Sequence, residues 1–360
     1  MKEQTRSRVL HLFAATLGVL LPLSLGARSL PVTPTFNTPG NILIADQFNN
    51  RVLEADASGR ILWQFGLGPN DFSIRSVPGV NDAERVGANT LIVGTGIAAG
   101  VNPQVPDGVV DNRVMLVDQA KHIIWQYGVF GQTGAGLNRL NTPVQATWLP
   151  TSHVLITDQG NNRVIEVDLN RRIVWQYPGV NTPEFDLLNS PNSAQLLSNG
   201  HILIADENNN RAIEVTRTRQ IVRTFTAGGT VRGVAFASQL PNGHILLTDS
   251  GNSRVVEVDR FDNVFWQYFT DTEPLSIGAP SPSRAVRLLN GDTLISDQFN
   301  NRVIRVTRAG RIVARYGLPL AGGDNVGYNV LSTQRGLNAP YDAKIIGDYT
   351  GLTPPFAVTQ

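Results

Sequence analysis

Ile44-Ala-Asp-Gln-Phe-Asn-Asn-Arg-Val52 is the stretch of this 360-residue chain that decides its fold. Close copies of it occur at Ile156–Val164, Ile204–Ala212, Leu247–Val255 and Ile295–Val303. A sixth copy is broken, because an insertion separates Ile92-Val-Gly94 from Asp111-Asn-Arg-Val114. The arginine recurs at positions 51, 113, 163, 211, 254 and 302. A period of roughly 40–50 residues with four short apolar stretches per unit is typical of a β-propeller or a related closed array.

Three strands can be predicted within the first unit. The apolar run 41–45 predicts a strand that is covered on both faces. The segment 47–50 predicts a turn, since asparagine tolerates left-handed backbone. The alternating segment 51–55 predicts a half-buried strand, and 60–65 predicts a further strand after a hairpin turn that ends at Gly59. A propeller blade has four strands, so one strand is missing from this unit.

The missing strand is predicted from a short stretch centred on alanine that precedes the other units. Such stretches surround Ala83, Ala146, Ala194 and Ala285, whereas the one near 233–237 aligns ambiguously. Segment 337–346 resembles 188–197 along its whole length and has no unit behind it. We therefore expect an all-β, six-bladed β-propeller of four-stranded antiparallel blades, in which the C-terminal strand joins the N-terminal blade and closes the ring. Closure removes exposed sheet edges.

The two ends of the chain lie outside the repeats. Lys2, Arg6 and Arg8 precede an apolar run over 9–25 and then small residues, which predicts a signal peptide over 1–27 and an extracytoplasmic (secreted or periplasmic) protein. The alternative is an uncleaved anchor; no later stretch is long enough to span a membrane. We expect an extended segment over 28–38, the propeller over 39–348 and a tail over 349–360.

Composition excludes several classes of function. The hydrophobic fraction of 41% and the charged fraction of 16% are those of a globular protein. The chain contains no cysteine, which excludes disulfides, thiolate nucleophiles and cysteine-ligated zinc. A formal net charge of +1 and the lack of a lysine and arginine cluster argue against a nucleic-acid partner.

The recurring aspartate and arginine of each unit allow two interpretations. Rings of carboxylates could bind a cation, and rings of guanidinium groups could bind an anion. Alternatively, each aspartate accepts N–H groups of its own turn and pairs with the arginine of its own unit. We favour the second interpretation, because a structural device recurs in every unit whereas a site needs a few special residues.

The histidines do not form a catalytic group in the sequence. His153, His201 and His244 each stand one residue before an apolar strand, and His122 occupies a hairpin turn. No Gly-x-Ser-x-Gly or His-Glu-x-x-His motif is present. Tryptophan before glutamine also recurs in register, and we expect it to pack on the outer strand; Arg223 and Ala314 replace it in two units.

Irregular positions are the better candidates for a site. Residues that flank the central alanines share one strand face and are expected to line the channel of the propeller. They are Asp82, Glu84, Gln145, Thr147, Ser193, Gln195, Arg284, Asp342 and Lys344. Asp82, Glu84 and Asp342 come from adjacent blades and could bind calcium or act as an acid and base. The alternative is a water-filled channel in which Arg284 and Lys344 pair with the carboxylates.

Three long segments are the other candidates. Segment 95–110 interrupts the second unit, and segments 128–138 and 317–336 are rich in glycine. Insertions into a regular repeat often map to the binding face, although flexible connectors are equally consistent with these sequences.

The repeat as a whole resembles a known family. Its pattern is Asp-x-x-Asn-Asn-Arg-Val-x-Glu-x-Asp-x-x-Gly-x-Ile-x-Trp-Gln-Tyr-Gly, and over 39–348 it resembles NHL-repeat six-bladed β-propellers. The resemblance implies that fold and a broad range of functions, from protein and RNA binding to lyases and hydrolases. The Ile-Val-Trp-Gln-Tyr ends are also similar to repeats of bacterial arylsulfotransferase propellers, which would require a histidine in the channel.

The sequence thus predicts an exported, monomeric, non-catalytic propeller without a cofactor, which binds a protein, a glycan or a small ligand through its loop face or channel. Two enzymatic alternatives remain open. One is a hydrolase or lyase with a divalent cation, for example calcium, at Asp82, Glu84 and Asp342. The other is an arylsulfotransferase-like enzyme.

Overall fold

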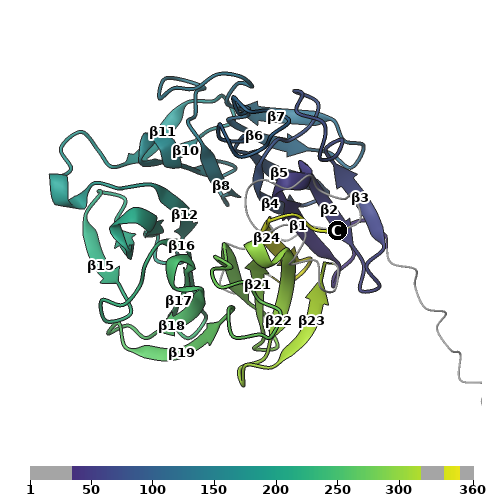
Figure 1. Ribbon diagram of the computed structural model, residues 1–360. Coiled ribbons are helices and arrows are strands. Elements are labelled where there is room, and N and C mark those ends of the chain that lie inside the picture. Colours follow the sequence, from purple (N-terminus) through teal and green to yellow (C-terminus); the bar gives the residue numbers. More distant parts are fainter. Residues whose placement is uncertain (1–34, 318–335, 349–360) are drawn as a thin grey trace, which may run out of the picture. The chain divides into compact units, whose positions relative to one another are not determined.

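Six four-stranded antiparallel sheets form a ring in the computed structural model, which describes residues 35–317 and 336–348 (Figure 1). Blade 1 contains β24 (Pro340–Ile345), β1 (Ile42–Asp46), β2 (Arg51–Ala55) and β3 (Ile61–Phe65). Blade 2 contains β4 (Val80–Val86), β5 (Asn89–Gly94), β6 (Arg113–Val117) and β7 (Ile123–Tyr127). Blade 3 contains β8 (Pro143–Trp148), β9 (Val154–Asp158), β10 (Arg163–Val167) and β11 (Ile173–Tyr177).

The remaining three blades repeat this order from the channel outward. Blade 4 contains β12 (Pro191–Leu196), β13 (Ile202–Asp206), β14 (Arg211–Val215) and β15 (Ile221–Phe225). Blade 5 contains β16 (Val234–Gln239), β17 (Ile245–Asp249), β18 (Arg254–Val258) and β19 (Val264–Phe269). Blade 6 contains β20 (Arg284–Arg287), β21 (Thr293–Asp297), β22 (Arg302–Val306) and β23 (Ile312–Tyr316).

Short 3₁₀ turns are the only helical elements of the described residues: η1 (Gln47–Asn49), η2 (Gln159–Asn161), η3 (Glu184–Asp186), η4 (Glu207–Asn209), η5 (Ser250–Asn252) and η6 (Gln298–Asn300). All except η3 connect the second and third strands of a blade. We call the face of the ring that carries these turns and the connections between blades the loop face. No helix of the described chain has the length and apolarity to cross a membrane.

The predicted closure of the ring is confirmed. β24 pairs antiparallel with β1, with Ala343 opposite Ile44 and Ile345 opposite Ile42. In Figure 1 the yellow β24 lies beside the purple β1, although the two strands come from opposite ends of the chain. The structure also identifies the central alanine of blade 5, which the sequence left ambiguous. Ala237 lies opposite Leu247 in blade 5, just as Ala194 lies opposite Ile204 in blade 4.

The recurring aspartate and arginine fix the turns on the loop face. In blade 1 the Nε of Arg51 donates to Asp46 at 2.7 Å, and the Nδ2 of Asn49 donates to the same carboxylate at 2.7 Å. Asn50 ends η1 in the left-handed conformation. The same aspartate–arginine pair forms in blades 3 to 6 at 2.6–2.7 Å. The structural interpretation of this series is therefore the one that the contacts support.

Blade 2 builds the same turn from different residues. Gly94 lies opposite Arg113, where the other blades have aspartate opposite arginine. A Cβ on Gly94 would approach the Oδ2 of Asp111 to 2.3 Å, because that carboxylate fills the space of the absent side chain and pairs with Arg113. The insertion thus leaves the ring intact and emerges on the loop face, where Ile97 and Val109 bridge its two arms.

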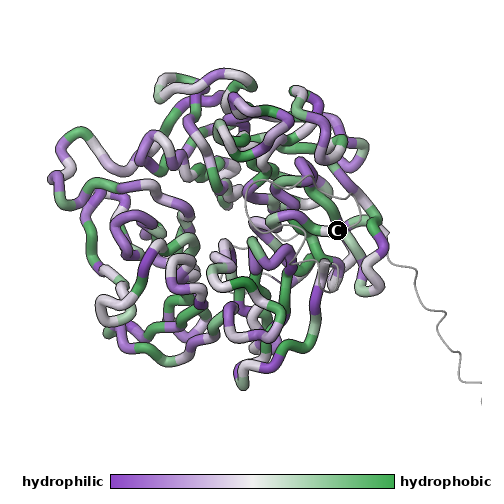
Figure 2. Tube along the Cα trace, viewed as in Figure 1, coloured by the Kyte–Doolittle hydropathy of each residue, from purple (hydrophilic) through white to green (hydrophobic). Residues whose placement is uncertain are grey.

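Hydrophobic side chains pack between neighbouring blades. One cluster joins Leu203 and Ala212 of blade 4 to Ala237, Leu247 and Val256 of blade 5. Hydrophobic and hydrophilic segments alternate along the chain in every blade (Figure 2). The expected signal peptide (1–27), most of the expected segment 28–38, most of the long segment 317–336 and the expected tail (349–360) lie outside the described residues.

Candidate functional site

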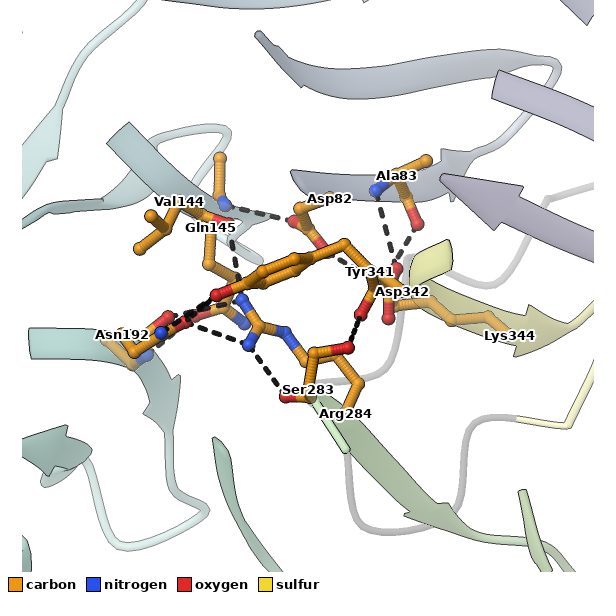
Figure 3. Close-up of polar contacts among 12 residues, drawn as sticks. Asp82, Ala83, Val144, Gln145, Asn192, Ser283, Arg284, Tyr341, Asp342 and Lys344 are labelled. Atoms are coloured by element: carbon orange, nitrogen blue, oxygen red, sulfur yellow. Dashed lines mark hydrogen bonds and ion pairs between the residues drawn. The ribbon is translucent and has the colours of Figure 1, made fainter. Parts of the chain in front are cut away.

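The innermost strands surround a central channel, and polar side chains connect them around it (Figure 3). A carboxylate, amide or hydroxyl oxygen of one blade accepts the N–H of the central alanine of the next blade. Asp342 accepts from Ala83 at 3.4 Å, Asp82 from Ala146 at 3.0 Å, Gln145 from Ala194 at 2.6 Å and Ser193 from Ala237 at 3.1 Å. Four of the nine predicted site residues thus join blades 1 to 5. We call this series of bonds the alanine belt.

The alanine belt does not extend around blade 6. The position that should accept the N–H of Ala285 is occupied by Phe236, and the position that should accept the N–H of Ala343 is occupied by Arg284. Phenylalanine has no acceptor, and a guanidinium group only donates. Ser283 supplies a replacement link, because its hydroxyl donates to the carbonyl of Tyr341 at 2.7 Å.

Arg284 extends across the channel rather than along its wall (Figure 3). It is 1% exposed, and its Nη1 donates to the Oδ1 of Asn192 at 2.9 Å and to the carbonyl of Ala235 at 3.0 Å. Its Nη2 donates to the carbonyl of Val144 at 3.2 Å. The guanidinium lies between two rings, 4.8 Å from the centroid of Tyr341 and 5.2 Å from that of Phe236.

Tyr341 covers Arg284 from the side of blade 1. Its hydroxyl lies 2.9 Å from the Nδ2 of Asn192, in the blade on the opposite side of the ring. Burial raises the pKa of the Tyr341 hydroxyl, so this group stays neutral. Tyr341 and Arg284 thus both place their side chains across the channel (Figure 3). The hydrogen bonds of Arg284 go to carbonyl groups instead of the carboxylates that the sequence suggested as its partners.

Lys344 does pair with carboxylates as expected. Its Nζ donates to the Oδ1 of Asp82 at 2.9 Å, to the carbonyl of Ala83 at 2.9 Å and to Asp342. Burial raises the pKa of Asp342 to about 6, and the charge of Lys344 opposes that shift. The carboxylates hold the pKa of Lys344 above its ordinary value despite burial. Lys344 is therefore charged, and it occupies the space between Asp82 and Asp342.

Glu84 lies two residues after Asp82 on β4 and is 5% exposed. Burial raises its pKa to about 8; the charge of Lys344 opposes this shift and that of Asp82 adds to it. Its Oε1 has no hydrogen-bond partner among the described residues. Glu84 is therefore protonated at neutral pH. In blade 4 the equivalent residue is Gln195, whose Oε1 accepts the N–H of Gln239 at 2.8 Å. Thr147 occupies this position in blade 3 and is also buried.

The structure thus brings Asp82, Glu84, Asp342 and Lys344 together, as predicted. Among the residues that the structure describes, no group of three histidine or acidic side chains has a geometry that could hold a metal ion. Calcium ligation by these residues would require displacement of the Lys344 ammonium, since cations compete for the same oxygens. The predicted cation site therefore remains a hypothesis.

Several residues at the loop-face end of the channel were missed by the sequence analysis. Gln298 donates to Gln47 at 2.9 Å, and Gln47 donates to Asn81 at 2.8 Å. Glu207 accepts a hydrogen bond from Asn192 at 2.8 Å. Burial raises the pKa of Glu207, and this hydrogen bond partly offsets the rise. A sequence signal for part of this group exists, because the residue after each repeated aspartate is polar. These residues are Gln47, Gln159, Glu207, Ser250 and Gln298.

The in-register histidines belong to the opposite face and have structural partners. His153, His201 and His244 contact Glu166, Glu214 and Glu257 through Nδ1 at 2.6, 2.6 and 2.8 Å. Glu166 also pairs with Arg217 at 2.5 Å. Burial raises the pKa of Glu257, but hydrogen bonds from Arg308 and His244 outweigh that effect and lower it. These contacts tie strands within a blade and join it to the next blade.

A cavity of about 350 Å³ lies on the loop face under the insertion of blade 2. Its lining is largely apolar and combines three blades: Phe48 comes from blade 1, Ile97 and Val109 from the insertion, and Thr142 from the entrance to blade 3. Asp107 is the only ionisable side chain among the lining residues, and it has no ion-pair partner within the described chain. A cavity of this size and composition is suited to a small ligand or a side chain.

Comparisons with known proteins support the fold. No protein-family model matches the chain, and no curated protein matches it. A streptogramin B lyase structure superposes with a TM-score of 0.51 at 12% identity, over 78% of this chain and 80% of that chain. A protein of unknown function from Bacteroides caccae gives a TM-score of 0.52 at 12% identity, over 77% of this chain and 93% of that chain. Virginiamycin B lyase from Staphylococcus aureus gives a TM-score of 0.46 at 14% identity, over 67% and 70% of the two chains.

Proposed function

We propose that this six-bladed propeller is an exported, non-catalytic binding protein whose ligand site is the cavity under the insertion 95–110. The observation that carries the proposal is the cavity itself. The one irregular turn of the ring, in blade 2, forms the roof of a cavity of about 350 Å³ whose other walls come from blades 1 and 3. Loops on a rigid scaffold are where binding residues concentrate.

The lining of this cavity defines the chemistry of the ligand. Ile97, Val101 and Val109 supply apolar surface, and Gln47 and Asn141 supply amide groups. Because Asp107 is the only ionisable residue among those that line the cavity, the lining favours a neutral ligand or one with a single positive group. An apolar side chain of a protein partner, a small apolar amine and a neutral sugar ring fit this description.

The channel is less suited to a ligand than the cavity. Arg284 and Tyr341 extend across it, and Lys344 already pairs with Asp82 and Asp342. The histidines have glutamate partners on the opposite face. These contacts support a structural function for the usual catalytic residue types.

The test replaces residues 94–112 with Asp-Gln-Phe-Asn-Asn, the sequence that precedes Arg51 in blade 1. This graft restores the regular turn before Arg113, so the ring should stay folded by circular dichroism and thermal unfolding. A thermal-shift screen then compares both proteins with panels of apolar amines, short apolar peptides and neutral oligosaccharides. A ligand at 100 times its Kd should stabilise the wild type by about 2.7 kcal/mol and leave the graft unchanged. No shift in the wild type, or equal shifts in both proteins, would overturn the proposal.

A hydrolase or lyase with a divalent cation at the channel mouth is the second candidate. It is favoured by Glu84, a buried carboxyl with a pKa of about 8 and an unpartnered Oε1 beside two further carboxylates. Perturbed carboxyls of this kind occur in acid–base sites. Calorimetry with calcium on the wild type and on Asp342→Asn is the test. Heat that disappears in the variant supports this candidate, and absence of heat in the wild type removes it.

A further inference from the structure

Four of the six seams between blades contain a buried or half-buried indole. The Nε1 of each tryptophan donates to a backbone carbonyl in the outer hairpin of the next blade. The pairs are Trp63 with Gln119 at 3.0 Å, Trp125 with Leu169 at 3.1 Å, Trp175 with Arg217 at 2.9 Å and Trp266 with Arg308 at 2.8 Å. The ring therefore has one repeated slot that recognises an indole by shape and by its N–H group.

The walls of the slot are also repeated. Trp175 packs in one cluster with Val215 and Ile221, and Trp266 packs with Val306 and Ile312. A guanidinium lies over the ring in these seams, that of Arg217 at 4.9 Å from the centroid of Trp175 and that of Arg287 at 4.7 Å from that of Trp266. A cation over the ring face adds to the hydrophobic contact.

Two seams lack the tryptophan, and they differ from each other. Between blades 4 and 5, Arg223 replaces it and pairs with Glu214 at 3.8 Å. Asp262 also joins this seam, because its carboxylate accepts the N–H groups of Thr226 and Ala227 at 2.8–3.0 Å. Between blades 6 and 1, Ala314 replaces the tryptophan. Ala314 lies opposite Arg305 in blade 6, and Trp266 lies opposite Glu257 at the equivalent position of blade 5. No comparable side chain fills the second seam among the described residues.

A cavity of about 480 Å³ lies in the seam between blades 6 and 1. Its lining includes Ala314 and the residues of blade 1 that correspond to the walls of the filled slots. Ala55 of blade 1 is equivalent to Val306 of blade 6, and Ile61 is equivalent to Ile312. Ala57 stands where blade 6 has Arg308, and its carbonyl accepts no hydrogen bond from the described residues. The guanidinium of Arg315 is not available to this cavity, because it pairs with Glu273 and Arg315 alternates with Ala314 on β23.

We propose that this seam cavity is a binding site for the indole of a tryptophan side chain on an extended peptide of a partner protein. The filled slots receive their indole from an extended strand, which is why the proposal commits to a peptide. The indole N–H donates to the carbonyl of Ala57, and the ring packs on Ala55, Ile61 and Ala314. This site is separate from the cavity under the insertion and does not depend on it.

Ligand-observed saturation-transfer NMR with N-acetyl-tryptophanamide tests the proposal on the full chain. We expect saturation transfer to the indole protons with the wild type and loss of transfer with Ala314→Trp, which supplies the indole from the chain itself. Val313→Trp is the matched control, since Val313 is 38% exposed on the other face of β23, and this variant should bind as the wild type does. The 1-methylindole analogue, which lacks the N–H donor, should bind about two- to tenfold more weakly.

Four results would overturn the proposal. Undiminished transfer with Ala314→Trp would place the probe elsewhere on the molecule. Equal binding of N-acetyl-phenylalaninamide would show an apolar groove without recognition of the N–H group. Binding of free indole but not of N-acetyl-tryptophanamide would make the ligand a small molecule rather than a peptide. Binding only after residues 318–335 are replaced by a short glycine–serine linker would show that the chain itself occupies the cavity.

Discussion

Glu84 shows how the channel changes the chemistry of a single residue. Burial raises its pKa from 4.5 to about 8, with Lys344 acting in the opposite direction. In the unfolded chain the same carboxyl ionises near its ordinary value. Between pH of about 4.5 and about 8 the folded state therefore binds a proton that the unfolded state has released. Stability falls as pH rises through this window and stays constant above it.

We predict that Glu84→Gln removes this part of the pH dependence. The wild type should lose up to about 1.4 kcal/mol of unfolding free energy for each pH unit in the window. The amide of the variant does not titrate, and Gln195 shows that glutamine fits the equivalent position of blade 4. Urea unfolding at pH 5, 6, 7, 8 and 9 measures the difference between the two proteins, which isolates Glu84 from the other titrating groups. If the free energy of unfolding changed with pH in the same way in both proteins, the raised pKa of Glu84 would be contradicted.

At the residue level the sequence predicted the channel positions but not their contacts. Asp82, Glu84, Asp342 and Lys344 were grouped correctly because they flank the central alanines of adjacent blades. Asn192 and Tyr341 were missed because β-bulges interrupt the alternation of the innermost strands, between Pro191 and Ser193 and between Pro340 and Asp342. A bulge adds a residue that simple alternation cannot place. The reach of Arg284 across the channel depends on its side-chain conformation and has no sequence signal.

At the level of the element, the outer strand of four of the six blades is attached to the next blade by one tryptophan side chain. Trp175 is 6% exposed, packs in the seam between blades 3 and 4 and donates a hydrogen bond to Arg217. Ala314 occupies the corresponding place in blade 6 beside a cavity of about 480 Å³. The two seams therefore differ by one large side chain. Removing the tryptophan from the first seam and adding one to the second should have opposite effects on stability.

We predict that Trp175→Ala destabilises the protein by about 3–5 kcal/mol, because it leaves a cavity and an unpaired carbonyl. Ala314→Trp should stabilise it by about 1–2 kcal/mol, because the new indole fills an existing space. Val313→Trp is the control on the solvent-facing side of β23 and should change stability by less than about 0.5 kcal/mol. Thermal and chemical unfolding measure all three. Loss of stability in Ala314→Trp would indicate that the seam of blade 6 is not equivalent to the others.

The elements themselves were largely predictable from the sequence, with blade 2 as the instructive case. The repeated Asp-x-x-Asn-Asn-Arg turn located the second and third strands of five blades. In blade 2 the sequence indicated only an interruption, whereas the structure shows that Asp111 replaces the missing aspartate in space. The compensation comes from a residue on the far side of the insertion. Sequence spacing does not reveal it, because the path of the insertion between 95 and 110 decides it.

At the level of the whole molecule, the ring depends on contacts between distant parts of the chain. The N–H of Asn338 donates to Asp46 at 2.7 Å across 292 residues of sequence. Gly40 donates to the carbonyl of Ile346 at 2.9 Å, and Ile346 donates to the carbonyl of Asn41 at 2.8 Å. The bond from Ile346 to Asn41 has an equivalent in blade 4, where the N–H of Leu197 donates to the carbonyl of His201 at 2.8 Å. In blade 4 the two residues belong to one continuous hairpin. The ends of β24 and β1 are therefore close enough for a short covalent link.

We predict that a circular permutant folds to the same ring. It begins at residue 336, continues to 346, joins through Ser-Asn-Gly to residue 41 and ends at 317. The link reproduces the hairpin of blade 4, so unfolding should stay cooperative, with a melting temperature within a few degrees of the wild type. A chain that ends at 317 without the transferred strand is the comparison and should fail to unfold cooperatively. A permutant without a cooperative transition would contradict the proposed equivalence.

Six blades, their four strands and the closure by β24 followed from the sequence because each rests on a repeated local pattern. The contents of the channel did not follow, because they arise from six different strands meeting at one axis. The cavities under the insertion and in the seam of blade 6 likewise depend on what surrounds a residue in space rather than on its neighbours in sequence.

The pairing of β24 with β1 has a consequence for biosynthesis. The first blade leaves the ribosome with three strands and must wait for nearly the entire chain before its innermost strand arrives. During that time β1 presents an uncovered edge, and closing so long a loop makes completion slow. A nascent chain in this state is a natural client for chaperones and a ready template for misassembly with its neighbours. Export before completion would place this last step after translocation.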